Sequence, residues 1–184
     1  GLSIGDTPVK TVVLPPRATP SDKAAAAELV KRVQAAAGVK LRRQVWNDSL
    51  KKQAGLVFLG NAAVKAGGFT PKEMAEAGDD GYRIRTANGN AYIAGGPYGG
   101  TRFGAYAFLE RIGYKFYADD FVKTPEAGKV VLGDIDVVRT PFYEMRFFGA
   151  SAWSNRPELA EPREVKKLHG AATEGLGGTI FWDH

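Results

Sequence analysis

The sequence predicts an α+β protein in which helices pack on a mixed or antiparallel sheet, followed by the start of a second domain. Short β-branched runs bounded by Gly and Pro alternate with helical segments over residues 1–138. An Asn-Gly pair joins two of these runs as a hairpin. At 184 residues the chain is long enough to bury a hydrophobic core.

A strand and a long helix open the chain. Residues 9–14 form a β-branched run that ends at two prolines. Thr19 is suited to cap a helix and Pro20 to occupy its first position. Residues 24–37 are strong helix formers, and Gly38 is placed to end the helix in the left-handed region.

Two strands and two short helices are expected next. Residues 40–46 alternate apolar and polar side chains and predict a strand with one face in water, whereas residues 55–59 are continuously apolar and predict a buried strand. A short helix starts near Ala62, and Thr70 caps another.

The hairpin and a second long helix complete this part. Residues 82–86 and 91–94 alternate on either side of the Asn-Gly turn. Residues 101–112 predict a helix whose buried face would hold Phe103, Ala107, Phe108 and Leu109. Further short strands are expected at residues 114–117, 130–132 and 135–138.

The glycine-rich turn at residues 95–100 joins a strand to a helix, as phosphate-binding loops do. Thr101 follows the last glycine directly, and Arg102 comes after it, so the lysine of a phosphate loop is missing. A tight connection that needs glycine for close packing is the favoured interpretation.

The character of the chain changes after Thr140-Pro141. Residues 142–148 predict an aromatic strand, 158–168 a helix, and 179–182 a second apolar strand. The sequence therefore predicts a domain over residues 1–138 and the first β/α unit of an incomplete TIM barrel over residues 139–184.

Composition excludes several kinds of chemistry. There is no cysteine, so disulfides, thiolate metal sites and cysteine nucleophiles are excluded. His169 and His184 are too few for a three-histidine metal site. Basic residues are spread along the chain, which argues against nucleic-acid binding, and no apolar run is long enough to span a membrane. The acidic pairs at 79–80 and 119–120 fit turns and caps.

The last forty or so residues carry the candidate binding site. Sugar sites combine aromatic faces for stacking with polar groups that bind hydroxyls. The candidate substrate-binding residues are Arg146, Trp153, Trp182, Asp183 and His184.

Three segments in this order resemble a known domain. They read VVLPPRATPSDKAAAAELVKRVQAAAG, GLVFLGN and DGYRIRTANGNAYIAGGPYGGTRFGAYAFLERIGYKFYADD. Together they resemble the N-terminal accessory domain of family 67 α-glucuronidases, which is similar to the domain before the barrel in family 20 β-hexosaminidases and in many bacterial polysaccharide-utilisation proteins. The resemblance covers roughly residues 9–138.

The segment PFYEMR resembles the start of the family's (β/α)8 barrel. Arg146 approximately matches an arginine that contacts the sugar in family 20 enzymes, although Phe147-Phe148 stand where a glycine is usual. Trp182, Asp183 and His184 resemble the end of an early barrel strand, the end that faces the active site. The families' catalytic carboxylates lie on later strands, so the resemblance implies no catalytic residue, cofactor or metal in this chain.

The resemblance implies a non-catalytic N-terminal domain of a glycoside hydrolase acting on polysaccharide or glycan. Its partners would be its own catalytic domain and, through it, carbohydrate. The alternatives are a stand-alone module that binds carbohydrate, through tyrosines at 82, 92 and 98, or one that binds proteins or a second copy through the C-terminal aromatic segment. Gly1 in place of Met indicates a trimmed N-terminus, left either by removal of a signal peptide or by preparation of the chain. The first of these suits a secreted, periplasmic or cell-surface bacterial protein.

Overall fold

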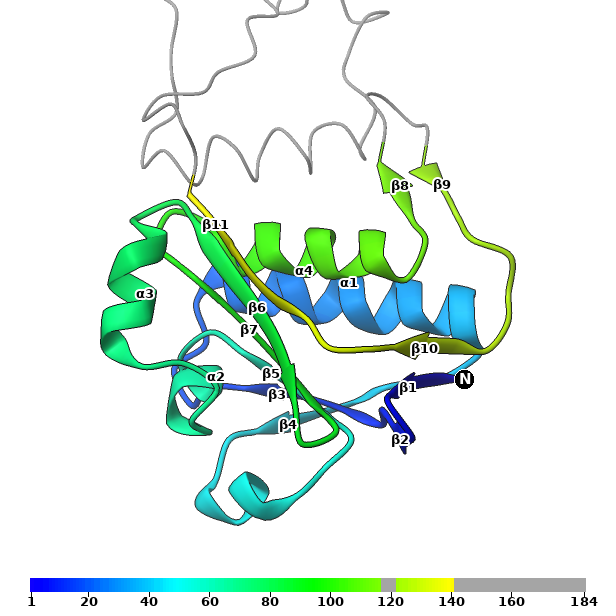
Figure 1. Ribbon diagram of the computed structural model, residues 1–184, viewed down its shortest axis with the longest axis horizontal. Coiled ribbons are helices and arrows are strands. Elements are labelled where there is room, and N and C mark those ends of the chain that lie inside the picture. Colours follow the sequence, from blue (N-terminus) through cyan, green and yellow to red (C-terminus); the bar gives the residue numbers. More distant parts are fainter. Residues whose placement is uncertain (117–121, 141–184) are drawn as a thin grey trace, which may run out of the picture.

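A six-stranded mixed sheet forms the centre of the protein. The computed structural model describes residues 1–116 and 122–140. The sheet has the strand order β11-β6-β7-β5-β3-β4, in which β4, β3, β5 and β7 are mutually parallel and β6 and β11 antiparallel to their neighbours (Figure 1). Its strands are β3 (Thr11–Leu14), β4 (Arg42–Val45), β5 (Leu56–Leu59), β6 (Tyr82–Ala87), β7 (Asn90–Gly95) and β11 (Asp136–Arg139). The predicted α+β class with a mixed sheet is confirmed for this part of the chain.

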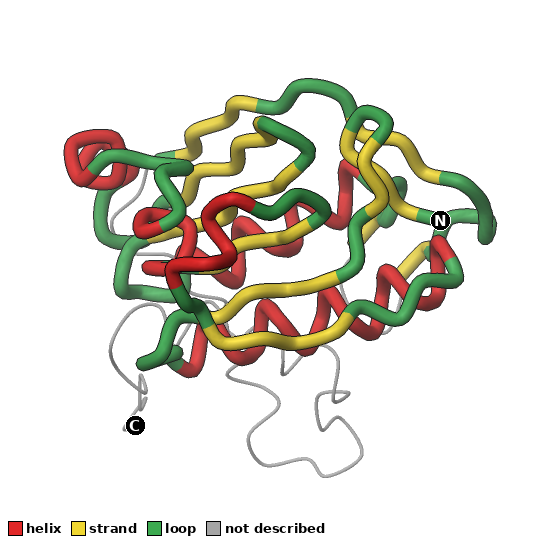
Figure 2. Tube along the Cα trace, turned by 90° about the horizontal axis from the view of Figure 1, so that it is seen from below, coloured by secondary structure: helices red, strands yellow, loops and turns green. Residues whose placement is uncertain are grey.

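Helices cover both faces of the sheet. The long helices α1 (Pro20–Ala37) and α4 (Gly100–Arg111) lie side by side against one face (Figures 1 and 2). The short helices α2 (Asn61–Lys65) and α3 (Pro71–Ala77) lie on the other, together with a 3-10 helix, η1 (Asp48–Lys52). None of the helices in the described ranges combines the length and apolar character needed to cross a bilayer.

Two hydrophobic cores result from the alternation of side chains along the strands. Val12 of β3 and Ile93 of β7 contribute to the core under α1 and α4. Their neighbours Val13 and Tyr92 point to the opposite core, beside Phe58 and the α2 side. Because successive strand residues face opposite sides, central strands covered on both faces bury every position.

The first long helix follows its sequence signals closely. The Thr19 side chain accepts a hydrogen bond from the Asp22 backbone N–H, and the Asp22 carboxylate accepts one from the Thr19 N–H. Gly38 ends the helix with φ 67°. Leu29 and Val33 are fully buried against the sheet. The predicted helix, its cap and its stop are confirmed.

The predicted hairpin is also confirmed. Asn88 and Gly89 have φ of 53° and 71°, and Ala87 pairs with Asn90 across the turn. Positive φ at both central residues is the two-residue turn whose twist matches that of paired strands.

Two sequence predictions about faces are wrong. All four residues of β4 are exposed, because it is the edge strand and only the flanking Leu41 and Trp46 reach the cores. On α4 the predicted Phe103 and Ala107 are only half-buried. The predicted Phe108 and Leu109 are buried, and Ala105 and small residues of the first turn are buried with them.

Two smaller sheets complete the described structure. In one, β1 (Leu2–Ile4) pairs in parallel with β10 (Val130–Leu132) and antiparallel with β2 (Thr7–Pro8). The amino group of Gly1 donates hydrogen bonds to the carbonyls of Ala37, at 2.6 Å, and Gly128, at 3.1 Å. In the other, β8 (Lys115–Phe116) pairs with β9 (Val122–Lys123).

Candidate functional site

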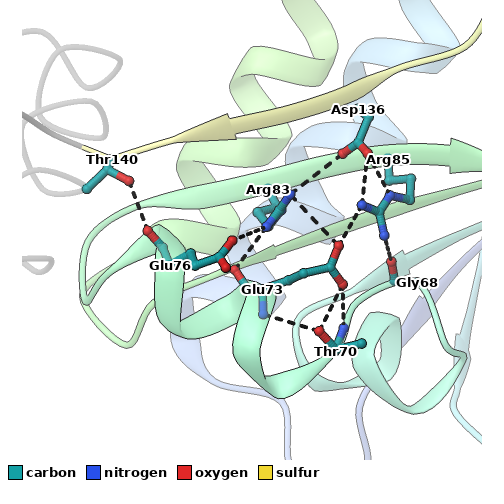
Figure 3. A network of polar contacts seen from close by, with 8 residues as sticks. All are labelled: Gly68, Thr70, Glu73, Glu76, Arg83, Arg85, Asp136 and Thr140. Atoms are coloured by element: carbon teal, nitrogen blue, oxygen red, sulfur yellow. Dashed lines mark hydrogen bonds and ion pairs between the residues drawn. The ribbon is translucent and has the colours of Figure 1, made fainter.

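The predicted sugar-binding residues lie outside the described part of the chain. This holds for Arg146, Trp153, Trp182, Asp183 and His184, and for the predicted strand–helix–strand unit that carries them. Within the described residues the densest group of charged side chains lies where β6, α3 and β11 meet (Figure 3). We refer to Arg83, Arg85, Glu73, Glu76 and Asp136 as the arginine–carboxylate network.

Arg85 is the best-connected member of this network. Its Nη2 donates to Glu73 Oε1 at 2.7 Å and to Asp136 Oδ2 at 2.8 Å, and its Nη1 donates to the Gly68 carbonyl at 2.8 Å. The guanidinium also lies over the ring of Phe69, 5.4 Å from its centroid. A planar group held by three acceptors and a ring has little freedom to reorient.

Arg83 lies two residues earlier on the same face of β6. It is only 9% exposed, and its Nη1 donates to the Glu73 carbonyl at 3.2 Å and to Glu76 at 3.3 Å. Its Nη2 lies 3.9 Å from both Glu73 and Asp136. Ile84, between the two arginines, faces the opposite core. The period of two along a strand thus directs both cations to α3.

Glu73 joins helix capping to the ion pairs. Its carboxylate accepts from the Thr70 N–H at 2.8 Å, while the Thr70 hydroxyl accepts from the Glu73 N–H at 3.2 Å. The side-chain hydrogen bond from Arg85 and those from Thr70 lower the pKa of Glu73 to about 2. The hydrogen bonds that Arg85 donates, to Glu73 first and to Asp136 second, raise the pKa of Arg85. Glu73 and Arg85 therefore form a charged pair across the physiological range.

The network and a hydrogen bond from Thr140 hold the two ends of β11. Asp136 is the first residue of β11 and is bound by Arg85. Four residues later the Thr140 hydroxyl donates to the Glu76 carbonyl of α3 at 3.2 Å (Figure 3). Both ends of this strand are thus tied to the same short helix and its neighbours. The described chain is therefore held as far as Thr140.

Sequence reasoning identified Thr70 as a cap but missed the network. The spacing of Arg83 and Arg85 in an alternating strand, and Glu73 three residues after the cap, were signals that could have been used. The partner Asp136 lies 51 residues from Arg85 in sequence, and nothing local indicates that pairing.

The glycine-rich turn serves close packing rather than an open phosphate cradle. Gly81, Gly95, Gly96 and Gly100 form what we call the glycine junction. A Cβ on Gly100 would lie 2.7 Å from Gly95 Cα, and one on Gly81 2.5 Å from the Arg139 carbonyl. The N–H groups of Gly96, Tyr98 and Gly100 already donate to the carbonyls of Gly81, Asp79 and Gly96. Backbone donors that a phosphate would need are thus committed to the protein.

The three tyrosines considered for glycan binding do not form an exposed platform. Tyr98 is 43% exposed and Tyr82 is half-buried. Tyr92 is 7% exposed and stacks on Phe58 at 5.3 Å between ring centroids. The expectation for Tyr92 is wrong because helices cover both faces of β7.

Neither a cluster of metal-binding side chains among the described residues nor a known relative indicates a further site. Among residues 1–116 and 122–140, no three His, Cys, Asp or Glu side chains gather closely enough to hold a metal ion. The sequence matches no known protein-family model. A search of curated proteins likewise finds no relative.

Proposed function

We propose that this chain is the non-catalytic N-terminal part of a glycoside hydrolase that acts on polysaccharide or glycan. Residues 1–138 would support a catalytic barrel whose first β/α unit lies within residues 139–184. The proposal starts from the ordered resemblance of three segments to the accessory domain of family 67 and family 20 enzymes. Those segments lie on β3 and α1, on β5, and on the hairpin β6–β7 with α4.

The observation that carries the proposal is the way the structure holds the start of the following segment. A supporting domain must present the next domain at a fixed position, because a loose joint would leave the two to move independently. Here Arg85 holds Asp136, and the Glu76 carbonyl holds Thr140, which belongs to the predicted joint to the barrel. Arg83 closes the same network from β6 at 3.3 Å.

The proposed partners and location follow from the same family resemblance. The domain would contact its own catalytic barrel, and carbohydrate would be bound by the barrel through residues such as Arg146 and Trp182. A bacterial protein that degrades polysaccharide would act outside the cytoplasm, in the periplasm, at the cell surface or after secretion.

The sequence of the natural gene product beyond residue 184 provides the sharpest test. We expect further β/α units, with carboxylates at the ends of later strands. In parallel, the purified 184-residue chain should give no turnover of aryl glucuronides or aryl N-acetylhexosaminides, while the whole gene product should hydrolyse one of them. Robust turnover by the 184-residue chain, or a gene product without β/α units, would overturn the proposal.

A further inference from the structure

A cavity of about 380 Å³ lies on the sheet face opposite α1 and α4. Its floor is formed by Tyr92 and Arg85, which pair directly across β6 and β7. One wall is the η1 turn with Lys51 and Lys52, and the other is the loop after α2, at residues 66–68. The volume falls in the range of small-molecule sites. The arginine–carboxylate network borders it through Arg85.

The charged side chains that line the cavity are all basic. Lys51, Lys52 and Arg85 line the cavity, and none of the described residues that line it is acidic. Glu73 and Asp136 bind Arg85 from outside the lining and balance its charge. Lys51 and Lys52 have no such partner among the described residues and are both exposed. A lining that carries basic side chains and no carboxylate favours an anion.

The walls are held in place before any ligand binds. Asn90, 3% exposed, accepts from the Leu56 N–H at 3.0 Å and donates to the Gln53 carbonyl at 2.9 Å. This ties the end of the η1 turn to β7. Arg85 in turn holds the opposite wall through the Gly68 carbonyl at 2.8 Å. A site whose walls need no ordering loses less entropy on binding.

A tyrosine whose ring is buried lines the same cavity. Tyr92 is more than nine-tenths buried, with its ring packed by Phe58 and Phe69. Its hydroxyl donates to no described residue and is not one of the fully buried polar atoms without a partner, so it reaches the open side of the cavity, where water or a ligand can bind it. The ring is needed for the core, but the hydroxyl is not. Phenylalanine would serve the packing equally well.

We propose that this cavity binds a small polar molecule bearing an oxyanion, a carboxylate or a phosphate group. Lys51 and Lys52 would bind the oxyanion by charge-assisted hydrogen bonds, and the Tyr92 hydroxyl would bind a polar atom of the ligand's body. The inference is independent of the proposed hydrolase function, because every residue that it uses lies within the described domain.

Chemical-shift titration of the ¹⁵N-labelled 184-residue chain tests this inference. Sodium phosphate, glucose 6-phosphate and sodium gluconate would be added at constant ionic strength, with glucose as the neutral control. We expect saturable shifts of the amides of residues 51–54, 66–68 and 88 with at least one anion, and none with glucose. Binding of only the phosphates or only gluconate would identify the oxyanion. Shifts that do not saturate, or that spread over all basic surfaces, would overturn the proposal.

Three variants separate a built site from general surface charge. Lys51→Gln with Lys52→Gln should weaken the binding of the anion about tenfold or more. Lys23→Gln with Lys129→Gln removes the same charge from exposed lysines elsewhere and should leave affinity within about twofold. Tyr92→Phe should weaken binding by about threefold or more while the melting temperature stays close to that of the wild type. Equal effects of the two double variants, or unchanged binding by Tyr92→Phe, would contradict the proposed site.

Discussion

Replacing Gly100 by alanine tests the glycine junction, because the general helix preference of alanine opposes what the structure predicts. Gly100 is the first residue of α4 and does not have positive φ, so alanine should favour the helix there by up to about 1 kcal/mol. The structure predicts the reverse sign. The new Cβ would lie 2.7 Å from Gly95 Cα and 2.8 Å from its carbonyl carbon, and it would also strike the Gly81 carbonyl oxygen.

The magnitude follows from what must move. Ordinary contacts of a Cβ begin at 3.4 Å, and the obstructing atoms belong to backbone rather than to flexible side chains. The start of α4 would have to separate from β6 and β7 by roughly 1 Å, at an overpacking cost of about 3 kcal/mol. It would also strain the 2.9 Å hydrogen bond from the Gly96 N–H to the Gly81 carbonyl. With the helix preference subtracted, about 2 kcal/mol of destabilisation remains, and the melting temperature should fall by roughly 4–8 °C.

Urea unfolding followed by far-ultraviolet circular dichroism measures this difference. Gly133→Ala is the matched control, because a Cβ there meets nothing within 4 Å and the residue does not have positive φ. We expect the control to be neutral or stabilised by about 0.5 kcal/mol. A Gly100→Ala protein as stable as the wild type would refute the close packing of the junction.

Three further predictions concern the first helix, the network and the second core. Thr19→Ala should destabilise the protein by about 1 kcal/mol in urea titration, because it removes the cap of α1. Since hydrogen bonds from Arg85 and Thr70 lower the pKa of Glu73 to about 2, the stability that these bonds add is complete above pH 4.5 and is lost as the pH falls towards 2. Glu73→Gln should therefore flatten the acid limb of a stability–pH curve, and an unchanged limb would contradict the ion pair. Phe58→Ala, at a fully buried ring, should cost about 3–5 kcal/mol in thermal or urea unfolding, whereas Val45→Thr, at 56% exposure, should stay within about 0.5 kcal/mol.

The features that sequence predicted well depend on residues close together in the chain. The Thr19 cap acts on a residue three positions away, and the Asn88-Gly89 turn pairs residues on either side of itself. Such features are encoded within one turn of structure. Hence the boundaries of α1 and the register of the β6–β7 hairpin could be predicted from the sequence alone.

The features that sequence predicted wrongly depend on what covers a strand. Residues 40–46 alternate like a half-buried strand, but β4 lies at the sheet edge beyond the helices and is exposed throughout. Tyr92 is buried for the opposite reason, since β7 lies centrally and is covered on both faces. Alternation in the sequence indicates only whether the two faces of a strand differ in polarity. It carries no information on the position of the strand in the sheet.

The candidate sites also could not be predicted where they join segments that are distant in sequence. The pairing of Arg85 with Asp136 and the cavity between η1 and the loop after α2 bring together segments distant in sequence, and neither could be predicted. The sugar-binding residues predicted at Arg146, Trp153, Trp182, Asp183 and His184 lie outside the described residues, and they stay predictions.

The parallel pairing of β1 with β10 has a consequence for how the chain folds during synthesis. Leu2 pairs with Val130, and β11 then pairs with β6. The ribosome adds about 5–20 residues per second, so the N-terminal strand would wait several seconds for its partner. Until β10 and β11 have left the ribosome, β1 pairs only with β2, and one edge each of β1 and β6 has no strand to pair with. A nascent chain stalled shortly before residue 130 should thus be open to proteolysis at its N-terminus, and one extended well past residue 140 should be protected.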